Sequence, residues 1–208
     1  MPHLALVGDG ILANAAHTKG QADTASGLRR LLPAWTVSLV AAEGSTISDV
    51  AAQLAKVSGP VDVAVLSVGG NDAMRHVDFL QQPASSSGET LDAPIAMADG
   101  FAGMYERVVK SVRERAPRLL LCTIYDPPLV GKNTANRARV LLTVLNDGIL
   151  KAAYRWGLDV LDLRAICTDA ADFTQQISPS GAGAAKIAHA IAAAVGGTEA
   201  KRTTVIAG

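Results

Sequence analysis

The chain has 208 residues, of which 49% are hydrophobic and only 4% aromatic, so aliphatic side chains must fill its core. A chain of this length suits a single domain that buries a substantial core. Its 19 basic residues balance 19 acidic ones, without a run of Lys or Arg, which argues against nucleic acid or an anionic membrane as the main partner.

The cysteines and the N-terminus bear on where the protein works. Cys122 and Cys167 stand in apolar contexts and form no metal or disulfide pattern, so we expect buried free thiols in a reducing compartment. The first residues carry no basic segment followed by a long apolar one, and no stretch approaches about 18 apolar residues. We therefore expect a soluble, cytoplasmic protein that uses no metal or other cofactor.

Strand and helix patterns alternate along the chain. Short apolar, β-branched runs predict strands at 3–7, 35–40, 61–68, 118–124 and 158–163. Longer helical patterns predict helices near 22–32, 47–57, 94–115, 135–156 and 183–195. Thr46 and Asp49 form a capping-box pattern at the start of the second helix. Because the apolar runs are continuous, the strands are expected to be buried on both sides. The sequence thus predicts a flavodoxin-like three-layer α/β/α sandwich with a five-stranded parallel sheet.

Two segments depart from this alternation. Residues 81–94 are rich in Pro, Ser and Gly, which predicts a surface loop. Residues 196–208 follow the last predicted helix and are expected to form a mobile tail. We predict one domain over 1–195.

Ligands of an open parallel sheet bind beyond the carboxyl ends of its strands. The segment "GDG" at 8–10 follows the first strand, and "GGND" at 69–72 follows the third. Glycines leave backbone amides exposed, and Asn71 adds a side-chain donor, a combination that suits an oxyanion or a carbonyl oxygen. Taken alone, the second segment is equally typical of a simple glycine-rich turn.

These segments resemble the SGNH, or GDSL-type, hydrolases. The resemblance rests on Gly-Asp after strand one, a Gly in the next loop, Gly-Gly-Asn-Asp after strand three, "TIYDPP" after strand four and "ISPSGAGAAKIAHAI" at 177–191. It implies an SGNH-hydrolase-like fold. In that family a serine after Gly-Asp attacks an ester, and a late Asp-x-x-His motif supplies the base and its orienting carboxylate.

The resemblance divides the site into a retained half and a lost half. It implies an oxyanion hole formed by the Gly10 amide, the Gly44 amide and the Asn71 side chain. The nucleophile position is occupied by Gly10, and the Asp and His positions by Gln175 and Ser178. None of these three side chains can act as nucleophile, carboxylate or base near neutral pH.

Other polar residues are candidates to replace the missing groups. His17, after strand one, is the first candidate for a replacement base, and His76 is the second, although a lone histidine in a polar loop is more often solvated. His189 lies too far along the last helix, and His3 at the wrong edge of the sheet. Asp9 is expected to order its turn, and Asp126 is either a site carboxylate or a turn former. Ser180, like Ser178, lacks an activator.

Gly8-x-Gly10-x-x-Ala13 also satisfies a relaxed dinucleotide-binding fingerprint, with Glu43 as the acid that would hold a ribose. Glu43 follows too late, however, and no helix begins directly after the glycines to hold a pyrophosphate. A nucleotide-binding Rossmann-like protein is therefore the weakest alternative.

Three functions remain open for an SGNH-like chain with these replacements. It binds a small acyl, ester or carbonyl ligand without cleaving it, or it performs altered chemistry on such a ligand through the retained hole, or it is a working esterase with an unrecognised base. A serine experimentally replaced at Gly10 would not explain the missing Asp-x-x-His motif. The sequence predicts lost or strongly changed ester hydrolysis and leaves the oligomeric state open.

Overall fold

The computed structural model describes residues 1–77, 83–196 and 204–205 of the chain. Its main sheet has five strands in the order β2-β1-β3-β4-β5, and all neighbouring pairs are parallel. The strands are β1 (His3–Gly8), β2 (Thr36–Leu39), β3 (Val63–Ser67), β4 (Arg118–Cys122) and β5 (Asp159–Leu161). The predicted fold class is confirmed. The strand order reverses between β1 and β3, which is where such sheets bind ligands.

Helices connect these strands. The α-helices are α1 (Thr24–Leu31), α2 (Val50–Leu54), α3 (Gly70–Met74), α4 (Ser87–Arg115), α5 (Lys132–Trp156), α6 (Leu163–Ile166) and α7 (Gly181–Gly196). Short 3-10 turns are η1 (Ala15–His17), η2 (Ile47–Asp49) and η4 (Ala170–Asp172), and a small hairpin joins β6 (Phe173–Thr174) to β7 (Ser178–Pro179). Among the described residues, no helix is both long and apolar enough to cross a lipid bilayer.

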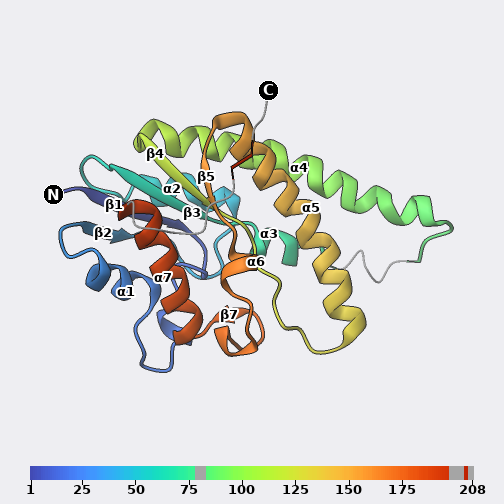
Figure 1. Cartoon of the computed structure of the whole chain (residues 1–208). Helices are drawn as coiled ribbons and strands as arrows, with labels where there is room; N and C mark the ends of the chain where they lie inside the picture. The colour runs from blue at the N-terminus through green and yellow to red at the C-terminus, as the bar shows by residue number, and fades with distance from the viewer. Residues whose placement is uncertain (78–82, 197–203, 206–208) are drawn as a thin grey trace.

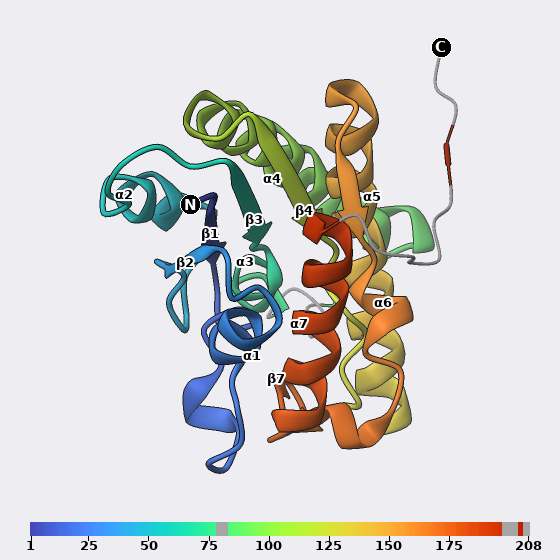
Figure 2. The same ribbon diagram turned by 60° about the vertical axis from the view of Figure 1, so that its left-hand side comes forward.

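The helices cover both faces of the sheet. Helices α1 and α7 lie side by side on one face, and α2, α4 and α5 cover the other (Figures 1 and 2). Successive side chains of a strand point to opposite faces, so each strand feeds two cores. In β1, Leu4 and Leu6 pack with α1 and α7, whereas Ala5 and Val7 pack with the α2, α4 and α5 side. The continuous apolar runs therefore indicated burial on both sides correctly.

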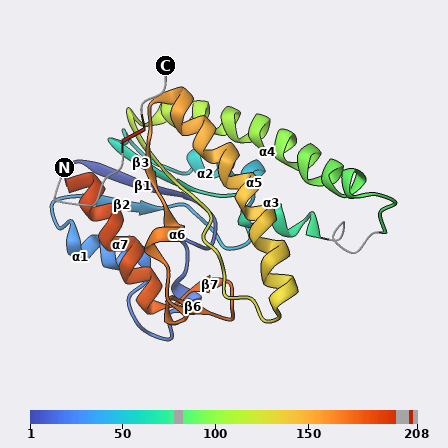
Figure 3. The same cartoon turned by 45° about the vertical axis from the view of Figure 1, so that its right-hand side comes forward.

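The N-terminal halves of α4 and α5 extend beyond the sheet, on the side where α3 and the β6–β7 hairpin lie (Figure 3). Sequence patterning missed part of this extension, because α4 begins at Ser87 and the loop predicted over 81–94 is wrong for 87–94. Ser86 caps the helix through a hydrogen bond from the Glu89 amide, and Pro94 is accommodated inside it. A favourable cap thus outweighs a composition that is typical of loops.

Other boundaries differ by a few residues. The capping box at Thr46 and Asp49 is present, but it opens η2, and the following α2 ends at Leu54 rather than at 57. Strand β1 is one residue longer than predicted, whereas the other four strands are shorter, since their pairing stops before the apolar runs do. Both cysteines are free and buried, as predicted. Most of the predicted tail at 196–208 lies outside the described residues.

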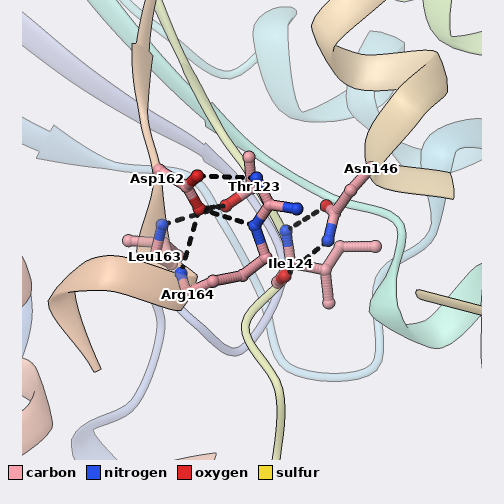
Figure 4. Close-up of polar contacts among 6 residues, drawn as sticks. All are labelled: Thr123, Ile124, Asn146, Asp162, Leu163 and Arg164. Atoms are coloured by element: carbon pink, nitrogen blue, oxygen red, sulfur yellow. Dashed lines mark hydrogen bonds and ion pairs between the residues drawn. The ribbon is translucent and has the colours of Figure 1, made fainter. Parts of the chain in front are cut away.

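Buried side-chain amides take over where strand pairing ends. Gln53, from α2, accepts a hydrogen bond from the Gly8 amide at 2.7 Å and donates one to the Gly8 carbonyl at 2.8 Å. Asn146, from α5, pairs in the same way with both backbone groups of Ile124 beyond β4 (Figure 4). Buried backbone groups need such partners. These two amides therefore fix the tips of β1 and β4, from which the site loops leave.

A second polar network fixes the tip of β5. The Asp162 carboxylate accepts hydrogen bonds from Thr123 and Arg164, and the Leu163 amide donates to the Thr123 hydroxyl (Figure 4). Partial burial of Asp162 would raise the pKa of its carboxyl, but the hydrogen bonds from Arg164 and Thr123 outweigh it and lower the pKa overall. The tips of β4 and β5 are thereby tied together.

Gln53→Leu keeps the volume of the side chain but removes both hydrogen bonds to Gly8, and it should lower the free energy of unfolding by about 2–4 kcal/mol. Urea unfolding followed by circular dichroism measures this loss. Asn136→Ala, which truncates an exposed amide of α5, is the control and should change stability by less than about 0.5 kcal/mol. Equal effects of the two substitutions would show that the Gln53 contact does not stabilise the fold.

Candidate functional site

The turn after β1 is built by a close approach of two strands. A side chain at Gly8 is impossible, because its Cβ would lie 1.8 Å from the Ser67 carbonyl oxygen of β3. The Asp9 amide donates to that same carbonyl at 2.8 Å, which holds the turn against β3. The first glycine of the "GDG" segment is therefore required by packing, and the turn presents Asp9 and Gly10 at the strand reversal point.

Asp9 orders this turn, as the sequence predicts. Its Oδ1 accepts hydrogen bonds from the Ile11 amide at 3.1 Å and from the Ser67 hydroxyl at 3.3 Å. The residue is only 3% exposed, and this burial raises the pKa of its carboxyl to about 7, against the lowering effect of the two hydrogen bonds. Oδ2 receives no hydrogen bond from the described residues, while Asp9 lines a cavity.

The loops after β2 and β3 are joined to each other beside this turn. Asn71, in α3, donates from its side-chain nitrogen to the Ser45 carbonyl at 2.8 Å. The neighbouring Asp72 carboxylate accepts from the Ile47 amide, and its partial burial raises its pKa. Gly44 adopts the left-handed conformation, with φ +76°, and no atom would contact a Cβ built there. The backbone around Gly44 therefore faces open space next to Asn71.

One cavity of about 480 Å³ collects the residues that the sequence singled out. Its polar lining consists of Asp9, Gly10, His17, Glu43, Gly44, Asn71, Thr134, Arg137 and Ser178. The amides of Gly10 and Gly44 donate no hydrogen bond to any described residue, and one N–H of the Asn71 amide remains beyond its bond to Ser45. Three potential donors for one oxygen thus line the same cavity. Their role as an oxyanion hole stays a prediction.

The other wall of the cavity is apolar. It is formed by side chains of α3 and the residues just after it, of α5, of the segment after β4 and of the β6–β7 hairpin, namely Ala73, Met74, Val77, Ile124, Tyr125, Pro127, Leu129, Ala138, Leu141, Leu142, Ile177 and Pro179. Tyr125 is held in place by a hydrogen bond from its hydroxyl to the Ile177 carbonyl and by an edge contact with Phe173. A wall of this kind accommodates an alkyl or acyl chain beside the polar end.

His17 lies inside this cavity and is paired with Glu43. Its Nε2 is 2.7 Å from Glu43 Oε1, and its side chain is 11% exposed compared with 58% for the glutamate. A Cβ built on Gly10 would lie 3.6 Å from Glu43 Cγ, an ordinary contact. The histidine–glutamate pair therefore stands next to the position where a side chain at residue 10 would project. Sequence reasoning named His17 but did not foresee this partner.

Of the other residues that the sequence analysis named, only some line the cavity. Ser178 lines the cavity, whereas Gln175 lies in the tip of the β6–β7 hairpin with φ 50° and does not. Ser180 caps α7 and donates to the Ala171 carbonyl, outside the cavity. His76 is exposed and, like His3 and His189, is absent from the lining, and Asp126 borders a separate, smaller cavity.

The dinucleotide-binding alternative does not fit the geometry after β1. The turn at Gly8–Gly10 leads into the short η1, and the first α-helix begins only at Thr24. Glu43, which would hold a ribose, is paired with His17. No α-helix therefore begins directly after the glycines, as the dinucleotide-binding fingerprint requires. The described residues also contain no group of three or more His, Cys, Asp or Glu side chains arranged to hold a metal ion.

Residues that no motif indicated complete the cavity. Thr134 and Arg137, from the first turns of α5, reach its rim, and Arg137 makes no ion pair with a described residue. Helical periodicity predicted α5, but it could not reveal that the N-terminal part of this helix extends past the sheet or which of its side chains line the cavity. Those contributions depend on how the long helices project beyond the strands.

The model of the GDSL-like Lipase/Acylhydrolase family matches residues 6–186, which is most of the chain. The chain belongs to this family. The match begins in β1 and ends in α7, so it includes every loop that builds the cavity. No curated protein sequence gives a significant match.

Solved structures of other hydrolases share this fold. An extracellular lipase from Streptomyces rimosus superposes with a TM-score of 0.71 at 14% identity, covering 92% of this chain and 98% of the lipase. An acetyl xylan esterase from Geobacillus stearothermophilus gives 0.69 at 16% identity, with 97% of each chain covered. LAE5, an α/β hydrolase from the metagenome of Lake Arreo in Spain, gives 0.70 at 21% identity, covering 96% of this chain and 97% of LAE5. At these identities the likeness concerns the fold alone.

Asp9 should make the stability of this GDSL-like protein fall as pH rises. Between pH 4 and 7 the folded carboxyl, with a pKa of about 7, keeps a proton that the unfolded chain, with a pKa near 3.8, has released. The folded state then binds more protons, so the free energy of unfolding decreases through this window. Asp9→Asn keeps an oxygen that accepts from Ile11 and Ser67 and should raise the Tm at pH 8 by roughly 2–4 °C or more.

Thermal unfolding at pH 5 and pH 8 tests this expectation. Asp92→Asn, which neutralises an exposed acid in α4, is the control and should leave the slope with pH unchanged. If Asp9→Asn shows the same dependence on pH as the unsubstituted protein, Asp9 is not the titrating group.

Proposed function

We propose that this protein binds an ester, acyl or carbonyl ligand in the cavity and does not hydrolyse esters through an enzyme nucleophile. The observation that carries the proposal is that unpaired backbone amides at Gly10 and Gly44 line a cavity in which residue 10 has no side chain. A site with donors for a carbonyl oxygen but no nucleophile favours binding, or chemistry in which water or the ligand itself supplies the attacking group.

The proposed loss of the nucleophile rests on three positions. The acetyl xylan esterase mentioned above has catalytic mutants at a serine, an aspartate and a histidine, and its histidine follows the aspartate by three residues. Gln175 and Ser178 have the same spacing here, and Gly10 follows Gly-Asp after β1. Neither an amide nor a hydroxyl is a base near neutral pH, and glycine offers nothing to acylate.

The retained donors define how the ligand would bind. Its carbonyl oxygen would accept hydrogen bonds from Gly10, Gly44 and the free N–H of Asn71, and its alkyl part would lie along the apolar wall formed by α3 and α5. A well-placed donor that meets a developing oxyanion is worth about 3–4 kcal/mol in the transition state. Altered acyl chemistry therefore remains compatible with the site after the loss of the triad.

Fluorophosphonate labelling tests for the missing nucleophile. The unsubstituted protein should remain unlabelled, whereas Gly10→Ser/Gln175→Asp/Ser178→His should be labelled at residue 10. The geometry accommodates these changes, because Gly10 has room for a Cβ and aspartate tolerates the left-handed backbone of Gln175. Gly10→Ala with the same two partners is the control, and intact-mass spectrometry is the measurement. Stoichiometric labelling of a serine in the unsubstituted protein would overturn the proposal.

Ligand binding tests the retained half of the site. Ethyl octanoate, whose chain suits the apolar wall, should bind, and Asn71→Ala should weaken this binding about fivefold, since one hydrogen bond contributes about 1 kcal/mol. Saturation-transfer NMR measures the dissociation constant, with the Tm recorded to exclude unfolding. Asn136→Ala is again the control for loss of an amide. Absence of binding to the unsubstituted protein would contradict the proposed function.

A further inference from the structure

The loop that carries His17 of the histidine–glutamate pair is anchored by buried hydrogen bonds. The His17 amide donates to the Asn14 carbonyl, and the fully buried Asn14 side chain bonds to Ile11 and to both the amide and the hydroxyl of Thr24. These contacts fix the loop that carries His17. The position of His17 is therefore more restricted than that of a histidine in a solvated loop.

Glu43 lies in the loop that follows the neighbouring strand β2. The Ala42 amide donates to the Gly8 carbonyl at 3.0 Å, so the backbone just before Glu43 is attached to the turn that carries Gly10. Glu43 Cγ would be 3.6 Å from a Cβ on Gly10. The carboxylate is thus placed by the same strand tip that positions the potential oxyanion donors.

The hydrogen bond between the two side chains determines which ring nitrogen is free. Nε2 of His17 lies 2.7 Å from Glu43 Oε1, and a carboxylate can only accept, so in the neutral imidazole Nε2 carries the proton. Nδ1 then has a lone pair, and it makes no hydrogen bond with a described residue. A carboxylate that orients a histidine and leaves its second nitrogen free is the arrangement of a general base.

We propose that His17 and Glu43 activate a water molecule in the space beside Gly10 that a nucleophilic side chain would otherwise occupy. This inference rests on the proposed function, and it names the base and the nucleophile for that site. It makes the protein a hydrolase of small acyl esters by direct attack of water, with no acyl-enzyme.

The step balances as follows. The water oxygen forms a bond to the carbonyl carbon of the ester while its proton passes to Nδ1 of His17. The carbonyl electron pair moves onto its oxygen, which accepts hydrogen bonds from Gly10, Gly44 and Asn71. When the bond to the leaving oxygen breaks, that oxygen takes the proton from His17, and the products are a carboxylic acid and an alcohol. Glu43 stays ionised and stabilises the transient imidazolium.

Hydrolysis of 4-nitrophenyl butyrate by the full-length protein tests the proposal. His17→Gln should lower kcat by about 10²–10⁴-fold with little change in KM, because a base contributes that factor to proton transfer. Glu43→Gln should also lower kcat, by a smaller factor and at unchanged KM. Added imidazole should restore activity to His17→Ala, which a merely structural role would not allow. His189→Gln, on α7 and outside the cavity, is the control and should match the unsubstituted protein.

The outcomes separate this proposal from the proposed function. Turnover that is lost in His17→Gln, rescued by imidazole in His17→Ala and not accompanied by fluorophosphonate labelling supports the dyad. Turnover equal to background, together with ethyl octanoate binding, overturns the dyad but leaves the binding function standing. Turnover that His17→Gln and His189→Gln leave equally intact also overturns it. Turnover equal to background, together with failure to bind ethyl octanoate, overturns both.

Discussion

The close approach of β1 to β3 is the constraint on which the site depends. Only a glycine at position 8 allows it, and the Ser67 carbonyl then accepts the Asp9 amide at 2.8 Å. The Gln53 side chain, from α2, forms hydrogen bonds with the amide and the carbonyl of Gly8. The sheet reverses its strand order between these two strands, and open parallel sheets bind their ligands at such a point. The residues of the turn therefore lie at the expected ligand site. The positions of Asp9, Gly10 and Glu43 all follow from this contact.

Side-chain amides carry this constraint to the neighbouring loops. Asn146 fixes the backbone of Ile124 beyond β4, Asn71 ties α3 to the loop after β2, and Asn14 closes the loop that contains His17. A side-chain amide can donate and accept at once, so a single residue satisfies the buried backbone groups that strand pairing leaves free. A cavity rim built in this way holds its hydrogen-bond donors in defined positions.

Much of the site was accessible from the sequence because it lies within short motifs. Gly10, Gly44, Asn71 and Ser178 each follow a predicted strand or belong to a family landmark, and parallel strands bring such segments to one edge. The cavity does contain all four, although their chemical roles remain predictions. Arg137 and Leu141 belong to no motif. They lie in an ordinary amphipathic helix, and they reach the cavity only because α5 extends past the sheet.

The sequence by itself determined the layered parallel fold, since continuous aliphatic runs alternating with helical patterns can bury both sides of each strand only in this way. It also determined that Gly10, Gln175 and Ser178 stand at the positions where the family resemblance predicts a serine, an aspartate and a histidine. The tertiary structure alone decided that Ser87–Pro94 is helical, that Asp9 is buried deeply enough for a pKa of about 7, and that His17 meets Glu43. These depend on contacts between segments far apart in the chain, such as the 26 residues that separate His17 from Glu43, and no local pattern encodes them.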